Sequence, residues 1–160
     1  MKLLLVFNPH AAAGRAADLL EPVQQVLGRF ADVDTHRTTG PGDATPWVAQ
    51  ADLSCYDGVL AAGGDGTFNE VANGIAGSKT PMALLPFGTT NVLSKELAVP
   101  GDVKGALEFA ITRTPRQVSL GRIDSPRSSF IHRHFILMAG IGYDGETVFG
   151  VNKTLKKFSG

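Results

Sequence analysis

The stretch best suited to chemistry is Ala62-Gly63-Gly64-Asp65-Gly66-Thr67-Phe68-Asn69-Glu70, which follows an apolar run and opens a helical pattern. Glycines in such a turn let the backbone approach a ligand closely, and the N–H groups of a helix start favour an anion such as phosphate. Alternatively, the loop is only a tight turn in which Thr67 and Glu70 form a capping box. Capping would leave Asp65 unexplained, because a carboxylate among phosphate-directed amides needs a cation or a hydroxyl opposite it.

Three other apolar runs also end in polar residues. Asn8-Pro9 ends the first run, Thr38 to Asp43 follow the second, and Pro86 to Asn91 follow the fourth and add the hydroxyls of Thr89 and Thr90. Ligands of open α/β sheets bind outside the carboxyl ends of the strands. The sequence therefore predicts one glycine-rich cleft in which four strand ends meet.

The elements that would position this cleft alternate along the first part of the chain. Strands are predicted at Leu3–Phe7, Val33–Thr38, Gly58–Ala62 and Met82–Leu85, and helices at Ala16–Phe30, Asp43–Leu53, Thr67–Ile75, Asn91–Leu97 and Asp102–Thr112. This order is typical of a parallel sheet flanked by helices. After Thr114 the pattern changes, because Gln117–Ile123 and Phe130–Gly140 are consecutive strands with no helix between them. We expect these to open an antiparallel unit that the chain is too short to complete.

Composition sets further limits. The chain has 160 residues, of which 43% are hydrophobic, and its single cysteine, Cys55, cannot form an internal disulfide, so the cytoplasm is the default compartment. No run approaches the ~18 apolar residues of a membrane span, so any membrane contact is expected to be peripheral. Residues 1–80 carry a formal charge of −4 and residues 81–160 one of +4. This asymmetry is either scatter on a solvated surface or a basic surface that faces anionic lipid or phosphate.

Several motifs together resemble those of the diacylglycerol kinase catalytic family, and its bacterial lipid kinases in particular. They are Asn8-Pro9 with Gly14, Thr38 before Gly42-Asp43-Ala44, Gly63-Gly64-Asp65-Gly66-Thr67 with Asn69-Glu70-Val71, Pro86-x-Gly88-Thr89-x-Asn91, and Gly140-x-Gly142-x-Asp144. NAD kinases share the Gly-Gly-Asp-Gly sequence, but the segments at residues 69–71 and 86–91 resemble the lipid kinases. Two positions depart from the family pattern, since Val92 and Ser119 stand where relatives often have aspartate.

The resemblance implies a nucleotide-binding α/β domain over residues 1–114 and the start of a β-sandwich, lipid-binding domain over residues 115–160. ATP and Mg²⁺ would be the cofactors, and Asp65 would be catalytic. The implied nucleotide-binding residues are Asn8, Thr38, Gly63, Gly64, Asp65, Gly66, Thr67, Asn69, Glu70, Gly88, Thr89 and Asn91.

The function implied by the resemblance is an ATP-dependent lipid kinase that phosphorylates the hydroxyl of a diacylglycerol-like lipid at a membrane surface, with no nucleic-acid partner. Three alternatives stay open: a catalytically incomplete nucleotide-binding fragment, a kinase of a soluble acceptor like the NAD kinases, and a sphingoid-base kinase. Gly140 to Gly145 also spell a dinucleotide-binding G-x-G-x-x-G, but too few residues follow for the helix, strand and acidic residue that such a fold needs.

Two smaller expectations concern aromatic and imidazole side chains. His132 and His134 share a strand face without a third ligand nearby, so we expect exposed strand histidines rather than a zinc site. Trp47, at helical spacing from Ala51, is expected in the core.

Overall fold

The computed structural model describes residues 1–124 and 132–140. The elements follow one another as β1 (Lys2–Phe7), η1 (Ala11–Leu19), α1 (Leu20–Leu27), β2 (Asp32–Arg37), α2 (Ala44–Gln50), η2 (Leu53–Cys55), β3 (Gly58–Gly63), α3 (Asp65–Ile75), β4 (Met82–Pro86), α4 (Val92–Glu96), α5 (Val103–Thr112), β5 (Gly121–Asp124) and β6 (His132–Phe135). The α/β class predicted from the sequence is confirmed.

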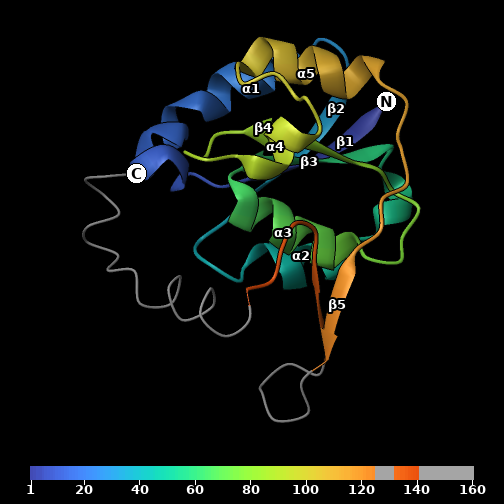
Figure 1. Cartoon of the computed structure of the whole chain (residues 1–160). Coiled ribbons are helices and arrows are strands. Elements are labelled where there is room, and N and C mark those ends of the chain that lie inside the picture. The colour runs from blue at the N-terminus through green and yellow to red at the C-terminus, as the bar shows by residue number, and fades with distance from the viewer. Residues whose placement is uncertain (125–131, 141–160) are drawn as a thin grey trace.

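The first four strands form one parallel sheet in the order β2-β1-β3-β4. Helices α1 and α5 cover one face of this sheet, and α2 and α3 cover the other (Figure 1). Strand β1 is apolar throughout because both of its faces are covered: Leu3, Leu5 and Phe7 belong to the core cluster of the α1/α5 side, and Leu4 and Val6 to that of the α2/α3 side.

The strand order fixes where a ligand can bind. From β1 the chain crosses outward to β2, and it then returns to the other side of β1 to build β3 and β4. The covering helix therefore changes face between β1 and β3, and the crevice outside the carboxyl ends of these two strands is where open α/β sheets bind ligands. The strand ends at which the sequence predicts a cleft meet at this edge, and the cleft itself stays a prediction.

Several helix boundaries differ from the prediction. The helix expected at Ala16–Phe30 is divided into η1 and α1, and Pro22 lies in the first turn of α1, where its missing N–H costs no helical hydrogen bond. Within η1, Ala12, Ala13 and Gly14 have positive φ values of 52°, 57° and 89°, so a continuous helix cannot pass through them. Helix α3 begins at Asp65 rather than Thr67, which places the second and third glycines of the motif at its start.

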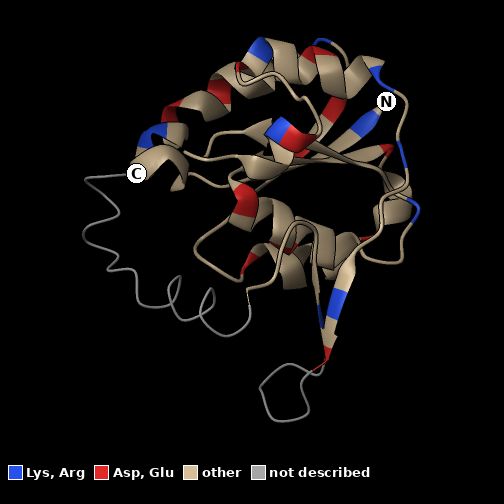
Figure 2. Cartoon of the chain, in the orientation of Figure 1, with Lys and Arg blue, Asp and Glu red and all other residues tan. Residues whose placement is uncertain are grey.

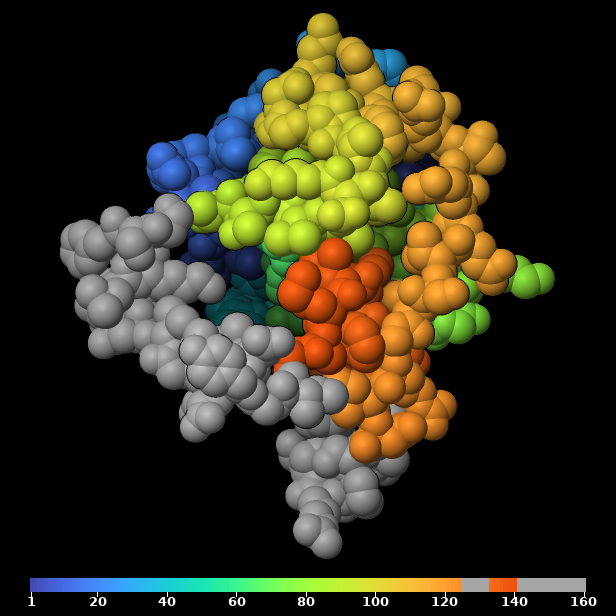
Figure 3. All heavy atoms as spheres, viewed as in Figure 1, coloured from blue at the N-terminus to red at the C-terminus, as the bar shows by residue number. Residues whose placement is uncertain are grey.

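The predicted antiparallel unit is present as a short hairpin in which Gly121 pairs with Phe135 and Asp124 with His132. Both strands are shorter than predicted, since residues 113–120 are irregular and β6 ends at Phe135. Figure 3 shows residues 132–140 beside the α4 region, and Ile136 and Leu137 pack on the α2/α3 core cluster near Leu93. The Gly140-x-Gly142-x-Asp144 motif continues beyond the described residues, and the division into domains at residue 114 stays a prediction.

Lys and Arg of the described chain are spread over several elements, among them β1 (Lys2), α4 (Lys95), α5 (Lys104) and β5 (Arg122) (Figure 2). No helix among residues 1–124 and 132–140 is both long and apolar enough to cross a bilayer.

Candidate functional site

Asn8 joins the end of β1 to the start of α3. Its Nδ2 donates a hydrogen bond to Thr67 Oγ1 at 2.9 Å, and its Oδ1 accepts one from the N–H of His10, also at 2.9 Å. The side chain is therefore engaged on both sides at the point where the sheet changes its covering helix. Thr38 follows the end of β2, one strand away, and is buried, with its N–H bonded to the carbonyl of Phe7 at 2.9 Å.

The glycines of the loop at residues 63–67 and of the loop at residues 86–91 have different surroundings. A Cβ on Gly63 would lie 2.6 Å from Thr67 Cβ, so this glycine allows the 63–67 loop to fold on itself. A Cβ on Gly88 would lie 2.7 Å from Gly64 Cα, so Gly88 allows the 86–91 loop to touch the 63–67 loop. Gly66 has no atom of the described residues within 4 Å of a would-be Cβ, and its φ is not positive. Neither packing within the chain nor backbone strain therefore requires glycine at position 66.

The predicted capping box at the start of α3 is wrong. Thr67 Oγ1 accepts its hydrogen bond from Asn8, Glu70 binds a different segment, and the N-cap residue Gly64 has no side chain to cap with. No acceptor in residues 1–124 and 132–140 is recorded for the N–H groups of Asp65, Gly66 and Thr67. These three amides, with the positive end of the helix dipole behind them, form a start that favours an anion.

Asp65 caps the start of another helix. Its Oδ2 accepts the N–H of Val92 at 3.0 Å and its Oδ1 accepts the N–H of Leu93 at 3.0 Å, which are the first two residues of α4. These bonds hold the 86–91 loop against the 63–67 loop. They also give Asp65 two partners that the sequence did not predict, namely the backbone amides of Val92 and Leu93.

Glu70 likewise caps the start of α2 with its carboxylate. Its Oε1 accepts the N–H of Gly42 at 2.8 Å and its Oε2 accepts that of Ala44 at 3.1 Å, while the hydroxyl of Thr45 donates to the Glu70 carbonyl at 3.0 Å. The long side chain of Glu70 thus fixes the loop that follows β2. This use of Glu70 could not be predicted from its own neighbours, because its partners lie more than 25 residues earlier in the chain.

Asp43 stabilises the same loop from inside. Its Oδ2 accepts the N–H of Thr39 at 2.8 Å and lies 3.2 Å from His36 Nε2. The donated N–H of Thr39, and then the contact with His36, hold the pKa of the Asp43 carboxyl below its ordinary value. His36 stacks on Trp47 with ring centroids 4.1 Å apart, and Trp47 is half-buried at the margin of the core rather than inside it as expected.

Asn91 and Thr89 complete the second loop. Asn91 adopts the left-handed conformation with φ of 46°, and its Nδ2 donates to the carbonyl of Gly88 at 2.7 Å. Its buried Oδ1 has no hydrogen-bond partner. Thr89 is exposed. The structure therefore brings together Asn8, Gly63–Thr67, Gly88 and Asn91 at one edge, with Thr89 at its rim.

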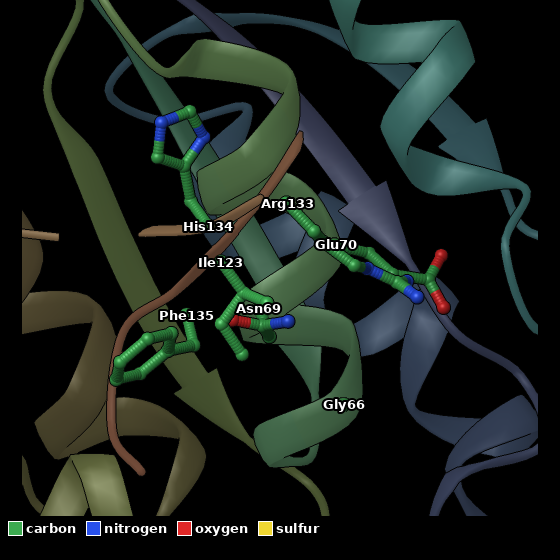
Figure 4. Close-up of a pocket in the computed structure, with 7 residues that line it drawn as sticks. All are labelled: Gly66, Asn69, Glu70, Ile123, Arg133, His134 and Phe135. Carbon is green, nitrogen blue, oxygen red and sulfur yellow. The ribbon is translucent and has the colours of Figure 1, made fainter. Parts of the chain in front are cut away.

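A pocket of about 360 Å³ lies between α3 and the hairpin (Figure 4). It is lined by Gly66, Asn69 and Glu70 from α3 and by Ile123, Arg133, His134 and Phe135 from the hairpin. Sequence reasoning missed the hairpin residues of this set. No sequence signal was available for them, because the adjacent residues Arg133, His134 and Phe135 all line the pocket and so do not follow the alternation of a strand. His134 is half-buried, so the prediction of an exposed histidine at this position is wrong.

Comparison with known proteins shows which family this chain belongs to. The profile of the family described as diacylglycerol kinase catalytic domain matches residues 2–123, which include the whole parallel sheet and both glycine loops. The chain therefore belongs to the diacylglycerol kinase catalytic domain family.

Individual relatives agree with this assignment. The chain is 33% identical to a diacylglycerol kinase of Bacillus subtilis over 98% of its own length and 50% of that protein, and 30% identical to one of Staphylococcus haemolyticus over 98% and 46%. A solved diacylglycerol kinase structure from Bacillus anthracis is similar with a TM-score of 0.61 and 32% identity, over 68% of this chain and 39% of that one. The chain spans about half the length of the curated relatives that it matches.

Proposed function

We propose that this chain is the nucleotide-binding part of an ATP-dependent lipid kinase. In the proposed reaction, the hydroxyl oxygen of a diacylglycerol-like lipid forms a bond to the γ-phosphorus of ATP while the bond from that phosphorus to the β,γ-bridging oxygen breaks. The products are a phosphorylated lipid and ADP, and the hydroxyl proton is released to the surroundings. Family membership supports the kinase chemistry, and the names of the relatives support the lipid acceptor.

The observation that carries this proposal is the open start of α3. The N–H groups of Asp65, Gly66 and Thr67 have no acceptor in the described part of the chain and lie at the edge where β1 and β3 end. Gly66 has no side chain, so no described side-chain atom fills the space in front of them. A phosphate of ATP placed there would accept hydrogen bonds from these amides and lie at the positive end of the helix dipole. Transfer of a phosphoryl group depends mainly on such positioning and charge stabilisation.

The predicted binding residues would have two kinds of role. The amides at 65–67 would bind phosphate directly, with Thr89 as a further hydroxyl at the rim. Asn8, Asn69, Glu70 and Asn91 would act by holding loops, because the hydrogen bonds of their side chains run to other protein atoms. Gly63, Gly64 and Gly88 would allow the close contact of the loops, and buried Thr38 would extend the sheet edge.

Residues 1–124 and 132–140 contain no group of three Asp, Glu, His or Cys side chains placed to hold a metal ion. Mg²⁺ commonly binds through one or two carboxylates together with the phosphates of a substrate. Within the proposal, the ion would therefore arrive with ATP and offset the charge of its phosphates.

A transfer assay with the protein expressed from its complete reading frame tests the proposal. The protein is incubated with γ-labelled ATP and either diacylglycerol in mixed micelles, a sphingoid base in the same micelles, or NAD in solution. We expect label in the diacylglycerol product and a requirement for micelles. Label only in the sphingoid base, label only in NAD, or no transfer to any acceptor would each overturn the proposed function.

A further inference from the structure

Two asparagines one helical turn apart on α3 bind the hairpin. Asn73 forms a closed pair with the backbone of His134: its Nδ2 donates to the His134 carbonyl at 2.8 Å, and its Oδ1 accepts the His134 N–H at 2.8 Å. Asn69 Oδ1 accepts the N–H of Ile136 at 3.2 Å. The joined residues are 61 and 67 positions apart in the chain, so these bonds fix how two distant segments sit on each other.

The carboxamide of Asn73 takes the place of a neighbouring strand. A peptide group of a paired strand offers one donor and one acceptor to the strand beside it, and the Asn73 side chain offers the same pair to His134. A second donated bond runs from Asn73 Nδ2 to the carbonyl of Asn69 at 2.8 Å, which locks the side chain to its own helix. The side chain is therefore held at both ends and has little freedom to turn away.

These bonds lie directly beside the pocket between α3 and the hairpin. One wall of the pocket consists of Gly66, Asn69 and Glu70 from α3, and the other includes Arg133 and Phe135, which flank His134 in β6 (Figure 4). A change in the distance between the walls would stretch or break the part-buried bonds of Asn73 and Asn69. The asparagines thus set the width of a pocket that also contains the open start of α3.

The face of α3 that holds the helix on the sheet is a different one. Phe68, Val71 and Ala72 are its buried residues on that face, while Asn73 is half-buried. Loss of the Asn73 carboxamide therefore leaves the apolar contact of α3 with the sheet intact. Its effect should fall on the position of the hairpin rather than on the folding of the parallel sheet.

We propose that Asn73 is a positioning residue for phosphoryl transfer, an inference that rests on the function proposed above. It holds the hairpin wall at the distance from α3 at which an acceptor hydroxyl in the pocket and a phosphate at the helix start are in line. Asn69 supports it by binding Ile136 and by accepting the Asn73 N–H through its carbonyl. Asn73 itself touches neither reactant.

The substitution Asn73→Asp tests this role at nearly constant size. Aspartate can still accept the N–H of His134, but it has no donor for the His134 carbonyl and places an oxygen against it. The matched control is Gln24→Glu, because Gln24 Nε2 also donates one part-buried bond between two elements, to Thr35 Oγ1 at 2.9 Å, and does not line the pocket. Asn73→Ala serves as a second variant in case the aspartate variant does not fold.

In the full-length protein we expect Asn73→Asp to lower kcat about tenfold or more, because small displacements of reacting groups have effects of this size. The dissociation constant for ADP should change less than about threefold, since the amides at the start of α3 are untouched. Hydrogen exchange at the amides of His134 and Ile136 should become faster. Gln24→Glu should leave kcat and both exchange rates at the wild-type values.

Three results would overturn the inference. They are an unchanged kcat in Asn73→Asp, a loss of ADP affinity parallel to the loss of kcat, or an equal fall of kcat in Gln24→Glu. Failure of the proposed function is distinguishable from these results, because it would appear as absent lipid phosphorylation by the wild-type protein itself.

Discussion

Three helices begin at the same edge of the sheet, and they differ in how their first amides are satisfied. The start of α2 is capped by the carboxylate of Glu70, and the start of α4 by that of Asp65. Both carboxylates come from α3. The start of α3 has neither a capping side chain nor a recorded acceptor within the described chain for the amides of residues 65–67.

The difference shows that the missing cap of α3 is selective. The first N–H groups of any helix lack partners inside the helix and are satisfied by caps, water or ligands. The two carboxylates of α3 that could act as caps are used at other helices, and the hydroxyl of Thr67 accepts from Asn8. Within the described residues, the starts of α2 and α4 are therefore capped internally, whereas the first amides of α3 stay available to an anion.

The largest expected effect comes from blocking the open start of α3 with a side chain. In the full-length protein, Gly66→Val should weaken ADP or ATP binding about a hundredfold or more, because its side chain would fill the space before the amides. The free energy of unfolding should change by less than about 1 kcal/mol, since a Cβ at this position meets no atom within 4 Å. Calorimetric titration measures the affinity, and urea unfolding followed by circular dichroism measures the stability.

Gly101→Val is the matched control for this substitution. Gly101 likewise has no atom within 4 Å of a would-be Cβ and no positive φ, and it lies outside the predicted site. Its variant should bind nucleotide as the parent does. If folded Gly66→Val titrated like the parent and like Gly101→Val, the 63–67 loop would be a turn and not a phosphate-binding loop.

A smaller effect is expected from the cap of α4. In the parent, the amides of Val92 and Leu93 each donate to one oxygen of Asp65. Asp65→Asn keeps an acceptor for only one of these amides and turns its N–H₂ group toward the second one. We expect a loss of about 1–2 kcal/mol in the free energy of unfolding, the usual range for a lost helix cap or an unsatisfied amide. Asp102→Asn is the control, because Asp102 caps α5 with a single bond from Gly105 that asparagine can also accept; its loss should be smaller.

The same variant also separates two roles of Asp65. A residue that only positions the 86–91 loop should lose activity in proportion to the loosening of that loop, which nucleotide affinity reports. A catalytic residue should lose kcat well beyond that change. A kcat within about threefold of the parent, equal to less than ~1 kcal/mol of barrier, would argue against the catalytic role predicted for Asp65.

All four strands of the parallel sheet were predicted to within one residue at each end. Strands β1, β3 and β4 are apolar runs, which is a local signal of a strand covered on both faces. The predicted binding site at the strand ends stays a prediction, while the structure places Asn8, Gly63–Thr67, Gly88 and Asn91 at one edge of the sheet. Which carboxylate caps which helix was not predictable, since Asp65 and Glu70 bind amides 26 to 28 positions away and only the sheet order brings them together.

The hairpin was the least predictable part. Its strands were expected to be longer because residues 117–120 alternate between polar and apolar and residues 136–139 are all apolar, and neither pattern marks the last ladder bond. The contacts of Asn73 were also outside the reach of the sequence. An asparagine on a helix surface has no local feature that shows it binding a strand 61 residues later.

The smallest expected effect concerns the start of α2, where Asp43 supports the loop that Glu70 caps. Because the N–H of Thr39 and the contact with His36 lower the pKa of Asp43 in the folded state below its ordinary value of 3.8, the ionised carboxyl stabilises the fold above that value. This contribution is lost as the pH falls through the lowered folded-state pKa. Asp43→Asn keeps an acceptor for the Thr39 N–H but cannot titrate, so its free energy of unfolding should fall less steeply than that of the parent below about pH 4. Urea unfolding at a series of pH values measures both slopes, and parallel slopes would show that Asp43 gives the loop no charge-dependent stability.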